Sequence, residues 1–154
     1  MTRIQSIGGC AALIALLVPG RFARATLGEG TGSIDADRAE LKGVQQAPVP
    51  HAGYSVTVVT SDATTVREYV SPSGTVFAVA WNGYVHPDLT QLLGTYWNDY
   101  KTARETAVRR HGRRRQQLAT NNLVVETWGH MRDLRGRAYI PALLPPGMSI
   151  DEIR

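Results

Sequence analysis

A dense run of cations is the sequence feature that most clearly predicts a binding function. Between Lys101 and Arg115 the chain carries six arginines and one histidine, opposed only by Glu105. Guanidinium groups at this density repel one another and bind phosphate or carboxylate groups in bidentate geometry. The segment therefore predicts a contact with an anionic surface or partner, and the alternative is a solvated helix end and loop without a dedicated ligand. The arginines assigned to this contact are Arg109, Arg110, Arg113, Arg114 and Arg115.

A second group of chemically interesting side chains surrounds Glu126 and His130. On a strand these two residues and Trp128 between them share a face, because strand side chains alternate with period two. A carboxylate within reach of an imidazole could act as an acid–base pair in a small hydrolase or lyase. The alternative, which we favour, is a hairpin whose charges pair and whose His130 hydrogen-bonds its own turn. The sequence therefore assigns no catalytic residue, with Glu126 and His130 kept as weak candidates.

Other kinds of site are not indicated by the sequence. The chain has four histidines and one cysteine, and none of the histidines pairs with another at the spacing that zinc sites use. No nucleophile elbow, Ser-x-x-Lys pair or phosphate-binding glycine loop occurs. We therefore expect no metal ion and no cofactor.

Two aromatic residues are candidates for a partner surface. Aromatic residues outside the core could mark such a surface, and the candidates are Trp128 and Tyr84. Exposed aromatic rings are enriched at protein interfaces, although such residues also pack against sheets. Both interpretations stay open at this point.

The first 25 residues are typical of a signal peptide. Arg3 supplies a positive start, residues 7–18 are apolar, and Ala23-Arg24-Ala25 provides the small-x-small cleavage site. An apolar run of about a dozen residues is short for a bilayer core of roughly 30 Å, so we expect no permanent membrane span after cleavage. We expect cleavage after Ala25 and a periplasmic or secreted product. The alternatives are an uncleaved anchor and lipid attachment at Cys10.

Cleavage would change the charge and the cysteine content of the chain. The full sequence has 17 basic and 13 acidic residues, and the first 25 residues hold three arginines and no acidic residue. The remaining chain would have a net charge of about +1 and no cysteine, so anions would be attracted by local clusters and not by the net charge. Expected partners are an envelope protein, anionic lipid or acidic polysaccharide, while nucleic acid is not expected.

The periodicity of apolar residues predicts three strands, a long helix and two further strands. Alternation begins at Tyr54, and 75–81 is apolar on both faces, which is typical of a central strand. Helical spacing follows Pro87 and could continue to about Arg110. Before the strands we expect a short helix from Ser33 through Lys42. The remaining predicted strands are residues 64–70, 123–128 and 137–140.

These elements predict an α+β fold. It would consist of an antiparallel sheet of about five strands, one long helix packed on a face of the sheet, and a short N-terminal helix. The expected organisation is a signal peptide over 1–25, the short helix and an extended connector over 26–53, the α+β domain over 54–147, and a C-terminal tail over 148–154.

Several linked motifs occur in one order along the chain. They are Val66-Arg67-Glu68-Tyr69, Val76-Phe77-Ala78-Val79-Ala80-Trp81, Pro87-Asp88-Leu89 with Leu92-Leu93-Gly94, and Gly129-His130-Met131-Arg132 with Gly136-Arg137-Ala138-Tyr139-Ile140-Pro141. From about Leu27 to Gly147 the chain resembles the proteobacterial family called domain of unknown function 2844. Tyr84 departs from the family pattern, which has proline there. The resemblance implies an exported protein and supplies no activity.

The sequence as a whole favours a non-enzymatic, exported envelope protein. It would bind a protein partner or an anionic surface through the arginine segment. The main alternative is the small hydrolase or lyase that uses Glu126 and His130. A third possibility is an accessory protein with a structural or assembly role.

Overall fold

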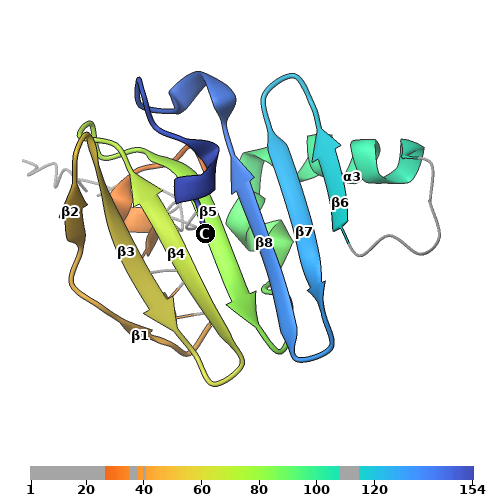
Figure 1. Ribbon diagram of the computed structural model, residues 1–154, viewed down its shortest axis with the longest axis horizontal. Helices are drawn as coiled ribbons and strands as arrows, with labels where there is room; N and C mark the ends of the chain where they lie inside the picture. Colours follow the sequence, from red (N-terminus) through yellow and green to blue (C-terminus); the bar gives the residue numbers. More distant parts are fainter. Residues whose placement is uncertain (1–26, 35–37, 40, 108–114) are drawn as a thin grey trace, which may run out of the picture.

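The computed structural model describes residues 27–34, 38, 39, 41–107 and 115–154, and one large antiparallel sheet dominates it (Figure 1). A helical segment of three joined parts connects β5 to β6: α2 (Leu89–Leu93), η2 (Gly94–Tyr96) and α3 (Trp97–Thr106). Three short 3-10 turns complete the structure: η1 (Thr31–Ser33), η3 (Pro141–Leu143) and η4 (Ile150–Glu152). The strands are β1 (Val44–Gln45), β2 (Val49–His51), β3 (Tyr54–Thr60), β4 (Thr64–Val70), β5 (Val76–Gly83), β6 (Arg115–Ala119), β7 (Val124–His130) and β8 (Asp133–Tyr139).

Six of the eight strands of the sheet form two groups of three. Its order is β1-β3-β4-β5-β8-β7-β6, and β2 also pairs with β3. Within the groups β3–β4–β5 and β6–β7–β8, consecutive strands pair antiparallel. The groups meet where β5 pairs with β8, with Ala78 opposite Tyr139. The helical segment connects the two groups. In the strand order β6 is the last strand, so it lies at the edge of the sheet farthest from β1 (Figure 1).

β5 occupies the centre of the sheet because it is apolar on both faces. Every residue from Val76 to Trp81 is buried. A strand covered on both sides gains from apolar residues at successive positions, whereas an edge strand alternates. The prediction of a central strand at this position is confirmed.

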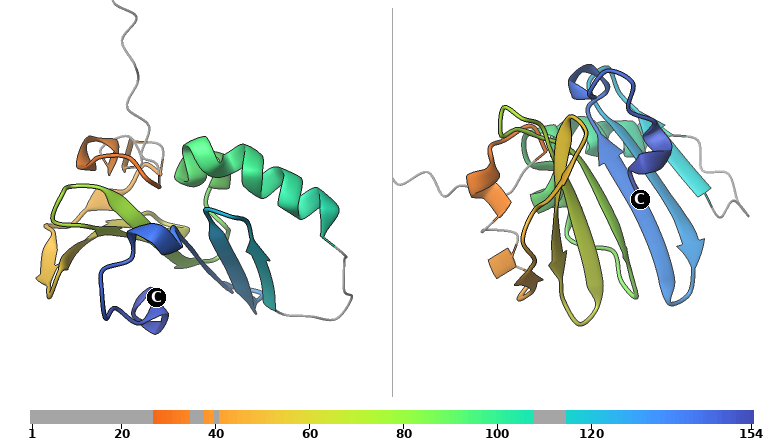
Figure 2. Two further views of the ribbon diagram at one scale, coloured as in Figure 1. Left: turned by 90° about the horizontal axis from the view of Figure 1, so that it is seen from above. Right: turned by 60° about the vertical axis from the view of Figure 1, so that its left-hand side comes forward.

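The helical segment covers one face of the sheet, as the left view of Figure 2 shows. Leu93 and Tyr100 are buried in the main core cluster together with Val79, Trp81 and Val125 of the sheet. α2 begins after Asp88, whose side chain accepts a hydrogen bond of 2.8 Å from the backbone amide of Thr90. The helical spacing predicted this segment, although α3 ends at Thr106 and not near Arg110.

The C-terminal residues lie on the opposite face of the sheet (Figure 2). Ile153 is fully buried in a second apolar cluster that includes Phe77 and Tyr139. Ser149 and Glu152 form a reciprocal capping box around η4, which fixes the turn. The hydroxyl of Tyr69 lies 3.0 Å from the carbonyl oxygen of Glu152, so the turn is also tied to β4.

The fold prediction was wrong in its number of strands and in its N-terminal helix. The sheet has eight strands, not about five. β1 and β2 have two and three residues, so they are too short to show a period-two pattern. Where a helix from Ser33 through Lys42 was expected, Thr31–Ser33 form the 3-10 turn η1, Ile34, Arg38 and Ala39 are helical, and Lys42 lies in a turn. The remaining positions of the expected helix, 35–37 and 40, lie outside the described residues.

β6 is the third strand that the sequence did not predict. It runs from Arg115 to Ala119, and Leu118 is its one buried residue. A short edge strand with exposed polar side chains has no apolar alternation to signal it. The arginines before it favoured a helix end and a loop instead.

Candidate functional site

The described ends of the arginine segment lie on two sides of the β6 edge. Lys101 and Arg104 are exposed on α3, which covers one face of the sheet. Arg115 is the first residue of β6. The other arginines assigned to anion binding lie outside the described residues, namely Arg109, Arg110, Arg113 and Arg114.

Strand alternation directs Arg115 to the face opposite α3. Leu118 and Val125 belong to the core cluster under the helical segment. Arg115 is three positions from Leu118, and Trp128 is three positions from Val125. An odd separation on a strand reverses the face, so the side chains of Arg115 and Trp128 point to the other face. Arg115 is opposite Trp128 in the β6–β7 pairing, and Trp128 is opposite Arg135 in the β7–β8 pairing. The register thus places these three side chains in one row.

A buried ion pair lies beside this row. Glu126 of β7 and Arg137 of β8 are opposite each other and only 4% and 8% exposed. Nε of Arg137 donates to Oε2 of Glu126 at 2.7 Å, and Nη2 of Arg137 lies 2.6 Å from the same oxygen. Nη1 of Arg137 donates to the carbonyl oxygen of Ile150 at 2.6 Å, so the pair also holds the C-terminal turn. Each charge is compensated, as burial requires.

Arg115 joins this pair from the solvent side. Its Nη2 donates to Oε2 of Glu126 at 3.1 Å, and its side chain is 62% exposed. The guanidinium carbons of Arg115 and Arg137 lie 5.8 and 5.6 Å from the centre of the Trp128 ring, within the range of cation–π interaction. Because Arg115 meets Glu126 through one of three nitrogens, its solvent side can bind a second anion.

Arg135 adds a second exposed guanidinium to the row. Its Nε donates to Oδ1 of Asp133 at 2.8 Å, and its side chain is 53% exposed. This hydrogen bond lowers the pKa of Asp133, which favours the ionised carboxylate. Arg135 is therefore partly neutralised by Asp133, whereas the Glu126 charge is shared between Arg115 and Arg137.

His130 is the last residue of β7 and its ring lies against its own turn. Its Nδ1 lies 3.3 Å from the carbonyl oxygen of Met131. Four residues of strand separate His130 from Glu126, which corresponds to about 13 Å at about 3.3 Å per residue. Trp128 lies between them, and the Glu126 carboxylate is bound by two arginines. This arrangement gives no support to an acid–base pair of Glu126 and His130.

The two aromatic candidates for a partner surface differ in their surroundings. Tyr84 follows β5 and is 64% exposed, next to the exposed Val85. Trp128 is half-buried beside the guanidinium groups of Arg115 and Arg137. Only Trp128 thus lies within the row of cationic side chains.

The remaining histidines and carboxylates gather in no metal site within the part of the chain that the structure describes. His86 instead accepts a hydrogen bond of 3.0 Å from Nε1 of Trp81 on its Nδ1 atom. Partial desolvation lowers the pKa of His86, which favours the neutral ring. Over the same described ranges, the helices are too short or too polar to cross a membrane.

The sequence did not predict that the C-terminal turn contributes to this site. Ser149 and Glu152 have the S-x-x-E spacing of a capping box, so the turn itself was detectable. The hydrogen bond from Arg137 to Ile150 was not, because it joins residues that no local pattern links.

Comparison with known proteins identifies a family and no characterised relative. The sequence model of a family described as "Protein of unknown function (DUF2844)" matches residues 23–153. No curated protein and no solved structure matches the chain. The matched range includes every described element of the sheet as well as the helical segment. The resemblance noted in the sequence motifs is thus confirmed, and the chain belongs to the DUF2844 family.

Proposed function

We propose that this protein is an exported, non-enzymatic binding protein of the bacterial envelope, and that it binds anionic surfaces at the β6 edge of its sheet. The observation that carries the proposal is Arg115: it is 62% exposed, yet it is held in place by Glu126. The signal-peptide pattern in residues 1–25 supports the assignment to the envelope.

Preorganisation makes Arg115 a better anion ligand than an ordinary surface arginine. A free arginine loses rotamer entropy when it binds, at a cost of about 0.5–1.5 kcal/mol per side chain. Arg115 is already restricted by Glu126 at 3.1 Å and by the Trp128 ring. Its guanidinium can therefore bind a phosphate or carboxylate at a smaller entropic cost than that of a free arginine.

The sequence around Arg115 supplies further cations. Arg113 and Arg114 precede it directly, and Lys101 and Arg104 are exposed on α3. Charges interact through salt solution over a Debye length of about 8–10 Å, so a local cluster acts even when the net charge is close to zero. This is the situation expected for the chain after cleavage.

The engagement of Glu126 supports a binding function over catalysis. A general base needs a carboxylate that is open to substrate. Oε2 of Glu126 instead receives contacts from Arg137 at 2.6 Å and from Arg115 at 3.1 Å. These contacts support a role of Glu126 in positioning cations.

Retention on lipid vesicles tests the proposal. The triple variant R113Q/R114Q/R115Q should bind vesicles containing anionic phospholipid at least about tenfold more weakly, since each basic residue near such a surface contributes about 1 kcal/mol. Zwitterionic vesicles should retain neither protein. Binding is measured by cosedimentation at physiological ionic strength, and circular dichroism confirms that the variant is folded.

A charge-matched variant provides the control. K42Q/R132Q/R154Q removes three charges from exposed positions outside the segment and should retain binding close to that of the unmodified protein. Unchanged retention of R113Q/R114Q/R115Q, or equal losses in both triple variants, would contradict the proposed site.

A further inference from the structure

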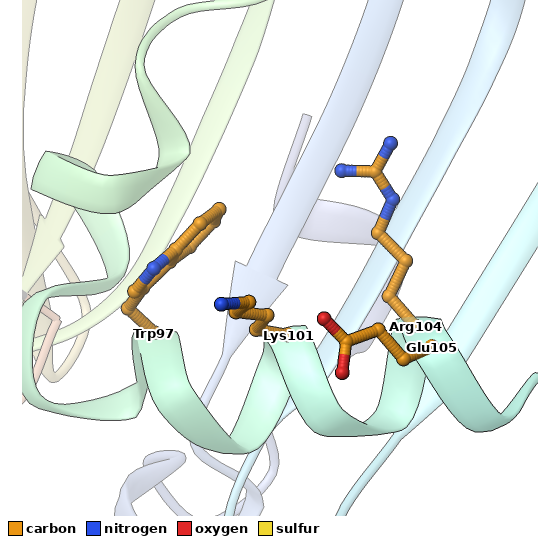
Figure 3. Close-up of a pocket in the computed structure, with 4 residues that line it drawn as sticks. All are labelled: Trp97, Lys101, Arg104 and Glu105. Carbon is orange, nitrogen blue, oxygen red and sulfur yellow. The ribbon is translucent and has the colours of Figure 1, made fainter.

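α3 carries a hollow of about 390 Å³ at the start of the arginine segment. Among the described residues it is lined by Trp97, Lys101, Arg104 and Glu105 (Figure 3). It lies on the helix-covered face of the sheet, whereas Arg115 points to the other face. The hollow is therefore separate from the row of Arg115, Trp128 and Arg135.

Helical spacing gathers these four side chains. Residues separated by three, four or seven positions lie on one side of a helix, which places Lys101 one turn and Arg104 two turns from Trp97 on that side. In Figure 3 the Arg104 side chain extends away from the Trp97 ring, toward the far end of the hollow. Figure 3 shows the amino group of Lys101 directed toward the Trp97 ring and the Glu105 carboxylate directed toward Lys101. The three charged residues are exposed, so their ends are accessible to a ligand.

Trp97 is the fixed wall of the hollow. It is half-buried, packs against the main core, and has its ring centre 5.6 Å from that of Tyr100. A ring held in this way presents its free surface without further loss of conformational freedom. Indole surfaces provide apolar contact area beside polar groups, as binding sites for amphipathic ligands require.

The combination of side chains restricts the chemistry of the ligand. Two cations call for an acidic group, the indole ring for an apolar face, and Glu105 for hydroxyl donors. Inorganic phosphate leaves the ring unused and brings no sugar hydroxyl to Glu105. A neutral sugar leaves Lys101 and Arg104 unused, and an apolar ligand leaves all three charges unsatisfied.

We propose that this hollow binds an acidic sugar residue, a pyranose ring that carries a phosphate or a carboxylate group. This inference rests on the proposed function and names the anion that the arginine segment recognises. Binding sites for small molecules have volumes of about 300–1,000 Å³, so the hollow suits one or two sugar units and not a longer stretch of polymer.

Titration with four small probes tests the inference. Glucose 6-phosphate and glucuronate are compared with neutral glucose and with inorganic phosphate by isothermal titration calorimetry of the full protein. We expect at least one acidic sugar to bind at least about tenfold more tightly than glucose and than phosphate, since each added charged contact contributes about 1.5–3 kcal/mol. Binding of only one acid supports the inference and identifies the acidic group.

Variants at exposed positions keep the test independent of folding. K101Q/R104Q should weaken acidic-sugar binding at least about tenfold, because it removes both cations. E105Q should weaken the binding of acidic sugars but not that of phosphate. K42Q/R132Q removes two exposed charges elsewhere and should change neither.

Three results would overturn the inference: glucose or phosphate binding as tightly as the acidic sugars, no detectable binding of either acidic sugar, or unchanged binding in K101Q/R104Q. The vesicle assay separates this failure from that of the proposed function. If R113Q/R114Q/R115Q still loses vesicle binding, only the sugar assignment fails. If acidic sugars bind as expected while that triple variant keeps its vesicle binding, the proposed contact at the β6 edge fails instead.

Discussion

At the scale of single residues, one oxygen atom organises the face opposite α3. Oε2 of Glu126 receives two contacts from Arg137, at 2.6 and 2.7 Å, and one from Arg115 at 3.1 Å. The first arginine is buried and also binds the C-terminal turn, whereas the second is exposed. Glu126 therefore links the stability of the fold to the position of Arg115, the side chain that we propose binds the anion.

Substitution of Glu126 should be costly because it leaves Arg137 buried without its counter-ion. Breaking a buried pair from one side costs about 3–5 kcal/mol, so E126Q should lower the free energy of unfolding by about 3 kcal/mol or more. R135Q breaks the exposed pair with Asp133 and should cost far less than E126Q, because water screens that pair. Urea denaturation measures both, and equal small effects would show that the Glu126–Arg137 pair does not stabilise the fold.

Only some of the contacts in this site could be predicted from the sequence. Period-two alternation predicted that Glu126 and Trp128 share a face, and both lie beside the guanidinium groups of Arg115 and Arg137. It could not predict which charges meet across strands, because that depends on the register of β6 against β7. Arg115 thus belonged to the predicted segment, but its contact with Glu126 did not follow from the sequence.

At the scale of elements, two segments with little apolar pattern complete the site. β6 has one buried residue, Leu118, and η4 is followed by one, Ile153. Among the strands that the sequence predicted, β3, β4 and β5 have repeated apolar positions. Their detection and the omission of β6 have the same cause: periodicity reports burial along an element, and an edge strand has little.

The C-terminal turn offers a matched pair of substitutions. Ile153 is fully buried, while Ile150, in the same turn, is 40% exposed. Ile153→Ala should lower the free energy of unfolding by about 2–4 kcal/mol through lost contacts and a cavity. Ile150→Ala should cost less than about 1 kcal/mol by the same reasoning. Chemical denaturation compares them, and an Ile153→Ala variant as stable as Ile150→Ala would contradict the docking of this turn on the sheet.

At the scale of the whole molecule, the two faces of the sheet have different covers. The helical segment lies on one face, and the C-terminal residues lie over part of the other (Figure 2). The described ends of the arginine segment lie on α3, which covers one face, and at β6, which forms one edge of the sheet (Figure 1). An extended anionic surface can therefore meet cations from both faces at this edge, while β1 and β2 lie at the other edge.

Hydrogen exchange with and without vesicles of anionic phospholipid tests this arrangement most directly. The amides of β6 and the end of α3 should exchange more slowly when vesicles are present at physiological ionic strength, and high salt should abolish the difference. The amides of β1 and β2 should be unaffected. Protection confined to the β1–β2 edge, or vesicle binding without any protection near β6, would contradict the account.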